Sequence, residues 1–401
     1  MLTGDLIVTD CLLFDGESEE LQETDVRIES GVIKEIGSGL VASDDIRRIE
    51  ARGSFVCPGF IDNHFHAYGI SLDMMEMEGS PTSFVALKAR QRLERALRRG
   101  FTTVRDVAGG DIGITKALSQ GLIAGPRYYF TGPALSQTGG HGDVRRADLD
   151  TCCLGRHSVE VVDGVENLRV AVRNRLRKGA HAIKIMTSGG VVSLTDPIHQ
   201  SQYSAEEVRA VVDEAQRRET YVCAHAYSSE AIVHSISNGV SCIEHGNLLD
   251  RPTASKMSEL NVALDPTLAT YVAMDKHGDS LGMDPIAQEK NSRVLNAGKV
   301  AVELAIEAGV AIGFGTDLMG DLEEFQLSGL GIQHEVQGTL GLLRSVTSVN
   351  AEILGVSHLG RLRVGYSGDL LMFTDNPFDK PQVLWDEQRR PVVVRSGCVV
   401  E

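Results

Sequence analysis

Short apolar runs separated by turn residues characterise both ends of the chain. Near the N-terminus the runs are Leu6–Thr9, Cys11–Phe14, Val26–Ile28 and Val32–Ile36. Near the C-terminus they are Asp369–Phe373 and Val392–Val400, the second interrupted at Ser396 and Gly397. Runs of this length, bounded by turn residues, predict β-strands. We expect the two ends to form one small β-sandwich domain.

The middle of the chain alternates apolar runs with amphipathic helical segments, a pattern typical of parallel βαβ units. The predicted helices are Phe84–Arg99, Val165–Lys178, Ala205–Arg218, Ser229–Ser237 and Lys299–Ala308. The strand candidates, in order, are Phe55–Ile61, Phe101–Val104, Tyr128–Gly132, His181–Met186, Tyr221–Ala224, Ser241–Glu244, Val262–Pro266 and Val310–Phe314. Eight strands suffice for a closed barrel, so the sequence predicts an α/β fold with a (β/α)8 TIM barrel. We expect the barrel over residues 58–357 and the β-sandwich domain over 1–57 and 358–401.

Composition narrows the class of protein. The 401 residues suit a barrel of about 250 residues with an appended domain. The net charge of −16 disfavours nucleic acid and anionic membranes as partners. No uncharged apolar stretch could span a bilayer, so we expect a soluble, cytoplasmic protein. The seven cysteines are odd in number and form no CxxC pair, which argues against a disulfide framework or a zinc ribbon.

Metal-competent residues follow the C-terminal ends of several predicted strands, where barrel enzymes carry their active sites. After strand one, the spacing of His64 and His66 places two imidazoles on the same side of an extended chain. His225 and His245 end strands five and six, and Asp317 follows strand eight. Taken singly, each histidine has an ordinary explanation as a hydrogen-bonded core or surface residue. Asp317 alone could cap the following helix.

Lys184 is the unusual residue of this set. It lies between Ile183 and Ile185 in predicted strand four, and a lysine is rarely buried unless it is paired. The order HxH, Lys, His, His, Asp on strands one, four, five, six and eight resembles the amidohydrolase superfamily. This resemblance covers almost the whole chain, including the approach Val56–Asp62 to the HxH strand and the terminal sheet domain.

The resemblance implies a pair of metal ions bridged by Lys184, which would react with CO2 to form a carbamate. A desolvated amine has a depressed pKa and can be carboxylated, which would explain a buried lysine. Zinc is the expected metal, although imidazole and oxygen ligands also suit cobalt, manganese and iron. By the resemblance, one metal is held by His64, His66 and Asp317, and the other by His225 and His245.

Finer motifs resemble one branch of the superfamily, which contains Xaa-Pro dipeptidases and related carboxypeptidase-like enzymes. The motifs are Ser136–Asp143, Lys184–Val191, Ala224–Tyr227 and Ile243–Asn247. That branch commonly has Ser-Pro-x-Asp-Pro after the glycine pair, whereas this chain has Leu194 in place of the first proline. The difference bears on the preferred substrate side chain rather than on hydrolysis.

The expected mechanism is attack of a metal-bridging hydroxide on an amide carbonyl. Asp317 would take the water proton and pass it to the departing amine. His141 would help to stabilise the oxyanion, and Tyr227 would bind the oxyanion or the substrate carboxylate. Two simpler explanations stay open at this stage: Tyr227 as a packing residue, and His141 as a loop histidine without a role.

These inferences favour a metallodipeptidase that acts on L-Xaa-L-Pro or related dipeptides. The alternative is hydrolysis of a non-peptide amide, such as an N-acyl amino acid, an ochratoxin-like amide or a cyclic amide like an imidazolone. A non-catalytic binding protein is less well supported, because it predicts loss of at least one ligand and all six are present. The expected partners are a small-molecule or dipeptide substrate and further copies of the chain in a homo-oligomer.

Overall fold

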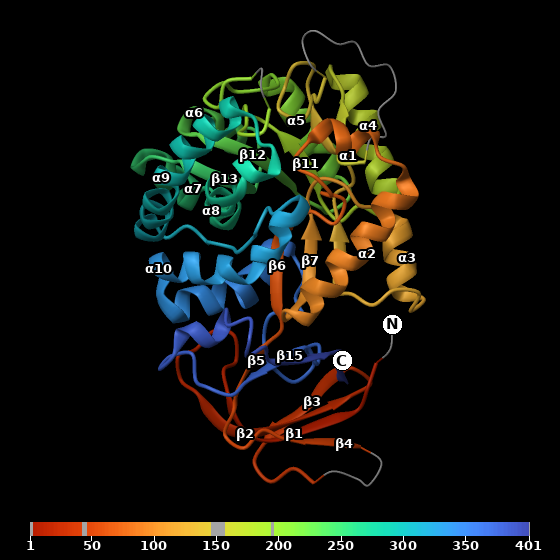
Figure 1. The fold of residues 1–401 in the computed structure, drawn as a ribbon, viewed down its shortest axis with the longest axis vertical. Coiled ribbons are helices and arrows are strands. Elements are labelled where there is room, and N and C mark those ends of the chain that lie inside the picture. Colours follow the sequence, from red (N-terminus) through yellow and green to blue (C-terminus); the bar gives the residue numbers. More distant parts are fainter. Residues whose placement is uncertain (1–2, 42–45, 146–156, 194–195, 401) are drawn as a thin grey trace.

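The computed structural model describes residues 3–41, 46–145, 157–193 and 196–400. Leu194 and two of the seven cysteines considered above, Cys152 and Cys153, lie outside the described residues. The chain forms a helix-covered set of parallel strands and, at one end of it, a separate mixed sheet (Figure 1). No helix among the described residues is both long enough and apolar enough to cross a bilayer.

Both ends of the chain meet in this mixed sheet, where red N-terminal strands lie beside blue C-terminal ones (Figure 1). The link is antiparallel pairing of β15 (Leu370–Phe373) with β5 (Phe55–Pro58). The first two predicted strands form a single strand, β1 (Leu6–Leu13), because Asp10 adopts a φ of 56° and makes a bulge instead of a turn. The remaining strands are β2 (Gln22–Glu29), β3 (Val32–Gly37), β4 (Arg47–Glu50), β16 (Val392–Arg395) and β17 (Cys398–Val399).

The larger part is built from parallel strands, which confirms the predicted TIM-barrel class. A backbone hydrogen bond of 2.8 Å from His181 to Phe130 joins its two sheets on one side. Two short strands that the sequence analysis did not predict, β9 (Ala134–Ser136) and β10 (Val159–Val161), extend one sheet. The barrel strands are β6 (Phe60–Phe65), β7 (Phe101–Asp106), β8 (Arg127–Phe130), β11 (Ile183–Met186), β12 (Val222–Ser228), β13 (Cys242–Leu248) and β14 (Ala263–Asp265).

The eighth barrel strand differs from its prediction. Instead of a regular strand over Val310–Phe314, the segment makes one bridge, between Ile312 and Leu264. The side chain of Asn350 replaces part of the missing pairing: its Oδ1 accepts from the Phe314 amide at 2.9 Å, and its Nδ2 donates to the carbonyls of Phe314 and Ile61 at 2.7 Å. A side-chain amide therefore joins the eighth segment to the first barrel strand.

The predicted strand Phe55–Ile61 is also two strands, divided at Gly59. A Cβ at Gly59 would lie 2.2 Å from Oγ1 of Thr102, so only glycine allows this close approach to β7. The strand before Gly59 joins the terminal sheet and the strand after it joins the barrel. The domain boundary predicted after Cys57 falls one residue before the end of β5.

Helices cover the outer face of the barrel strands (Figure 1). Ile183 and Ile185 pack in the apolar core with residues of the helices, whereas Lys184 and Met186, which alternate with them along β11, line the central cavity. The helices are α1 (Met74–Gly79), α2 (Thr82–Arg98), α3 (Ile112–Ser119), α4 (Val165–Arg177), α5 (Ala205–Gln216), α6 (Ser229–Ser237), α7 (Arg251–Glu259), α8 (Leu268–His277), α9 (Pro285–Ala308), α10 (Gln326–Arg344) and α11 (Asn350–Leu354).

Candidate active site

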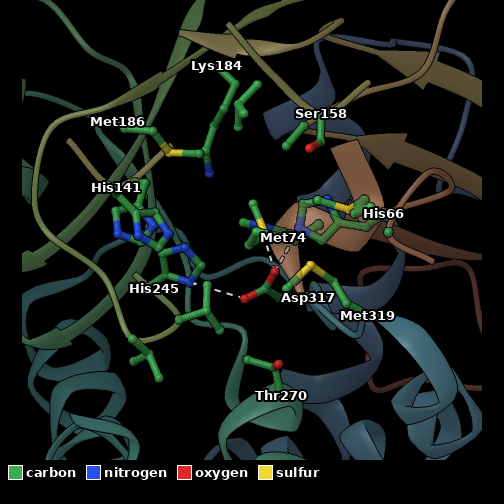
Figure 2. Close-up of a pocket in the computed structure, with 18 of the residues that line it drawn as sticks. His66, Met74, His141, Ser158, Lys184, Met186, His245, Thr270, Asp317 and Met319 are labelled. Carbon is green, nitrogen blue, oxygen red and sulfur yellow. Dashed lines mark hydrogen bonds and ion pairs between the residues drawn. The ribbon is translucent and has the colours of Figure 1, made fainter. Parts of the chain in front are cut away.

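A cavity lies at the C-terminal ends of the barrel strands and encloses about 660 Å³ together with its open mouth. All the site residues predicted from the sequence line it, which no spacing along the chain could guarantee. Figure 2 labels His66, His141, Lys184, His245 and Asp317 among them. The structure thus brings together the following side chains: His64, His66, His141, Lys184, His225, Tyr227, His245 and Asp317.

Asp317 lies between the histidines of β6 and β13. Its Oδ1 is 2.7 Å from Nε2 of His66 and 3.4 Å from Nε2 of His64, and its Oδ2 is 3.8 Å from Nδ1 of His245. Burial would raise the pKa of Asp317, but the neighbouring His64 and His66 hold it below its usual range. The carboxylate is therefore ionised near neutral pH and can serve as a metal ligand or a base.

Two of these residues have backbone conformations that side chains rarely adopt. The φ angle is +78° at His245 and +54° at Asp317. Along β13, Ile243 packs in the outer core, so strict alternation would direct Glu244 inward and His245 outward. The left-handed turn at His245 breaks this alternation, so that its imidazole also lines the cavity. Such strain is typical of functional sites, where the surrounding structure holds it.

His225 and His141 form a stacked pair on the other side of the cavity. Their ring centroids are 4.2 Å apart at an interplanar angle of 19°. Nε2 of His225 lies 3.1 Å from the carbonyl of Gly189, which leaves Nδ1 for a metal. His141 is held by its backbone amide, which donates to Gln202 at 3.0 Å, and by Nδ1, which is 2.8 Å from the hydroxyl of Ser193. These two hydrogen bonds therefore hold the loop in place at His141.

Lys184 points its ammonium group into the cavity, toward the histidines and Asp317 (Figure 2). The residue is 2% exposed, and Nζ has no hydrogen-bond partner among the described residues. Burying a neutral polar group without a hydrogen bond costs on the order of 2–7 kcal/mol, and burying an unpaired ammonium group costs more. A buried amine without a hydrogen-bond partner fits a lysine that is carboxylated and whose carbamate then binds cations.

Tyr227 packs against the aromatic rings of His225, His245 and Tyr271. Its ring stacks on His245, with centroids 5.1 Å apart and an interplanar angle of 17°. Its hydroxyl is 2.9 Å from that of Tyr271, which in turn lies 2.8 Å from Nδ1 of His245. Tyr271, on α8, was not found by sequence reasoning, because a tyrosine within an apolar helix carries no distinguishing signal.

A buried ion pair behind the cavity was also missed. Oε2 of Glu244 is 2.6 Å from Nδ1 of His64, and Oε1 is 2.7 Å from the guanidinium of Arg105, both carboxylate and guanidinium being fully buried. Burial would raise the pKa of Glu244, but Arg105 holds it below its usual range. The sequence did contain a signal for this pair, because Glu244 and Arg105 are charged residues within apolar strands. The same argument identified Lys184.

The donor set fits divalent metal ions. Ligand atoms of His64, His245 and Asp317 lie within 4.8 Å of one another, close enough to share an ion. Burial lowers the pKa of His64, His225 and His245 well below the usual range of an imidazole, which favours the unprotonated form that ligates a metal. With the orphaned Nζ of Lys184, the residues provide mixed nitrogen and oxygen ligands.

The fold and the cavity together define a barrel hydrolase with a metal-competent site. Residues 55–400 match the family model described as the Amidohydrolase family, and the chain belongs to this family. It is accordingly an enzyme of the class that hydrolyses amide bonds.

Three similar proteins carry further information. A solved prolidase in complex with N-methylphosphonate-L-proline is 41% identical with a TM-score of 0.96, and the match covers 99% of each chain. A Xaa-Pro dipeptidase with bound methionine is 28% identical with a TM-score of 0.89, over 99% of this chain and 100% of the other. Ochratoxinase from Aspergillus niger is 30% identical over 96% of this chain and 84% of its own length. The resemblance to the Xaa-Pro dipeptidase branch is confirmed.

Proposed function

We propose that this protein is a metal-dependent dipeptidase that hydrolyses the amide bond of L-Xaa-L-Pro or related dipeptides. The observation that carries the proposal is the convergence of the predicted ligands on one cavity. Among them is Nζ of Lys184, for which the described part of the chain offers no hydrogen-bond partner. The similarity to a prolidase over 99% of the chain supports the choice of substrate. The metals, expected to be zinc, would be held by His64, His66, His225, His245, Asp317 and carboxylated Lys184.

The bound ions would supply an activated water and polarise the amide carbonyl. Asp317 is the proton carrier, because its ionised carboxylate lies in the cavity beside His66 at 2.7 Å. It accepts the proton from water and delivers it to the amine that leaves. His141, fixed by Gln202 and Ser193, reaches the same cavity from the opposite side and donates to the developing oxyanion.

The remaining walls of the cavity suit an uncharged part of the substrate. They are formed largely by methionine, valine and alanine side chains, of which the unbranched methionines adapt to different shapes. The described apolar lining residues are Met74, Met77, Ala108, Val159, Met186, Val191, Val192, Met274 and Met319. Tyr227 lies between this lining and the histidines, and its hydroxyl is the candidate contact for the substrate carboxylate.

The second candidate function is hydrolysis of a non-peptide amide, such as an N-acyl amino acid, an ochratoxin-like amide or a cyclic amide. Two observations favour it: the similarity to ochratoxinase at 30% identity, and an apolar lining that would accept an acyl group as readily as a side chain. Both candidates use the same proton transfer by Asp317. The substrates of the two candidate functions differ only in the groups on either side of the amide bond.

A release assay on metal-reconstituted protein separates the two. The panel contains L-Xaa-L-Pro dipeptides, N-acyl amino acids and cyclic amides, and the metal content of the protein is measured in parallel. We expect close to two divalent metals per chain, loss of activity on chelation, and the highest kcat/KM for an L-Xaa-L-Pro dipeptide. Preference for an N-acyl or cyclic amide selects the second candidate. Full turnover by protein without detectable metal contradicts both.

A further inference from the structure

Arg92 is a buried arginine on α2 that takes no part in the chemistry described above. Only 4% of the residue is exposed. Its Nε donates to the carbonyl of His66 at 3.0 Å, one terminal nitrogen to that of Gly320 at 2.8 Å, and the other to that of Leu318 at 2.7 Å. Each nitrogen of the guanidinium thus binds a backbone carbonyl.

These carbonyls belong to the two segments that carry the Asp317–His66 pair. One is the carbonyl of His66 itself, and another belongs to Leu318, the residue directly after Asp317. Two backbone bonds of 2.8 Å also join the segments, from the Asp317 amide to the His64 carbonyl and from the Gly320 amide to the Gly69 carbonyl. Arg92 therefore binds both segments on the side away from the cavity.

The Asp317–Gly320 segment, which follows the eighth barrel segment, needs such support. Asp317 has a φ of +54° and Gly320 has a φ of +54°, so the chain turns twice within four residues. The eighth barrel segment supplies little regular strand pairing, as its single bridge at Ile312 shows. A planar guanidinium with fixed donor directions can hold three carbonyls in one arrangement, whereas a lysine ammonium offers a point charge on a flexible stem.

We propose that Arg92 is a positioning residue of the metal centre, which fixes His66 and Asp317 at ligand distance by binding the backbone carbonyls of both segments. The inference rests on the proposed function for the presence of metal. Groups that orient metal ligands typically contribute 10- to 100-fold to metal affinity. Replacing Arg92 is therefore expected to weaken metal binding while the protein still folds.

The test compares Arg92→Lys with Arg99→Lys. Arg99 is a matched control, because it is also buried, directly follows α2, and binds Glu323, which lies beyond the Asp317–Gly320 turn, rather than a carbonyl of that turn or of His66. Each protein, stripped of metal, is titrated with Co²⁺ while the visible absorption spectrum is recorded, since this spectrum reports coordination geometry. Folding of the metal-free proteins is followed by circular dichroism.

For Arg92→Lys we expect at least tenfold weaker Co²⁺ binding and an altered spectrum, with folded metal-free protein; Arg99→Lys should bind Co²⁺ as the unmodified chain does. Normal affinity and spectrum in Arg92→Lys, or equal losses in both variants, overturn the inference. An Arg92→Lys protein that does not fold also overturns it, because Arg92 would then support the whole barrel. Absence of Co²⁺ binding by the unmodified chain instead overturns the proposed function.

Discussion

The carboxylate of Glu244 lies 2.6 Å from Nδ1 of His64, on the side of the imidazole that faces away from Asp317. A histidine that donates one ring N–H to a carboxylate has its tautomer fixed, and its other nitrogen is free for a metal. Arg105 balances the charge of Glu244 at 2.7 Å, so the pair stays ionised although it is fully buried. The orientation of His64 thus depends on a residue adjacent to His245 in sequence.

Replacing Glu244 with glutamine should weaken metal binding by about 10- to 100-fold. Glu244→Gln keeps the shape of the side chain but removes the charge that orients His64 and balances Arg105. The measurement is chelator competition for the bound metal. Glu214→Gln is the control, since Glu214 is also buried but pairs with arginines of α4. Equal metal affinity in the two variants would show that the Glu244 charge does not act on the site.

Removing the amine of Lys184 should abolish activity and impair metal loading. Lys184→Ala leaves a gap where the bridging group is expected, and short carboxylic acids added with metal should occupy it and restore part of the rate. Metal content and rate are measured with and without acetate or propionate. The exposed Lys299, which pairs with Glu335, provides the control Lys299→Ala. Unchanged metal and rate in Lys184→Ala would identify Lys184 as an ordinary core lysine.

Asp317→Asn should reduce kcat at least a hundredfold while the fold and most of the metal remain. Asparagine tolerates the left-handed backbone at this position, where φ is +54°, and can still offer an oxygen to a metal. It cannot accept the proton of water, and general acid–base catalysis typically contributes about 10² to 10⁴ in rate.

Three measurements on Asp317→Asn are needed together: metal content, melting temperature and kcat. A normal melting temperature and metal content with a low kcat assigns the proton transfer to Asp317. A kcat close to that of the unmodified chain would remove Asp317 from the mechanism and leave it as a simple metal ligand, since the helical segment that follows begins at Gly320 and has Met319 at its N-cap.

Blocking the C-terminal carboxylate of a dipeptide substrate as an amide should lower kcat/KM at least tenfold, about 1.4 kcal/mol of transition-state stabilisation. The reason is loss of the contact expected from Tyr227, whose hydroxyl is held by Tyr271 at 2.9 Å. Tyr227→Phe should reduce the difference between free and blocked substrates. Equal rates on both substrates in the unmodified chain would favour the non-peptide amide as the natural substrate.

The sequence by itself determined the class of fold and the predicted residues that the structure brings together around the cavity. Periodicity was sufficient for most strands and helices, because burial on one face leaves a repeating pattern of apolar positions. The HxH spacing and the buried lysine of strand four were likewise readable from local sequence, since alternation decides on which side of a strand each residue lies. Charged residues in apolar strands were the strongest signals of the site.

Only the tertiary structure decided how those residues meet. The eighth strand was predicted as regular because its composition is apolar, but Asn350, distant in sequence, takes up part of its hydrogen bonding. The inward turn of His245 depends on a left-handed backbone that alternation would not predict. The hydrogen bonds of Arg92 and Tyr271 join elements that are far apart along the chain. Such contacts depend on how whole helices and strands pack against one another, and no local sequence pattern predicts them.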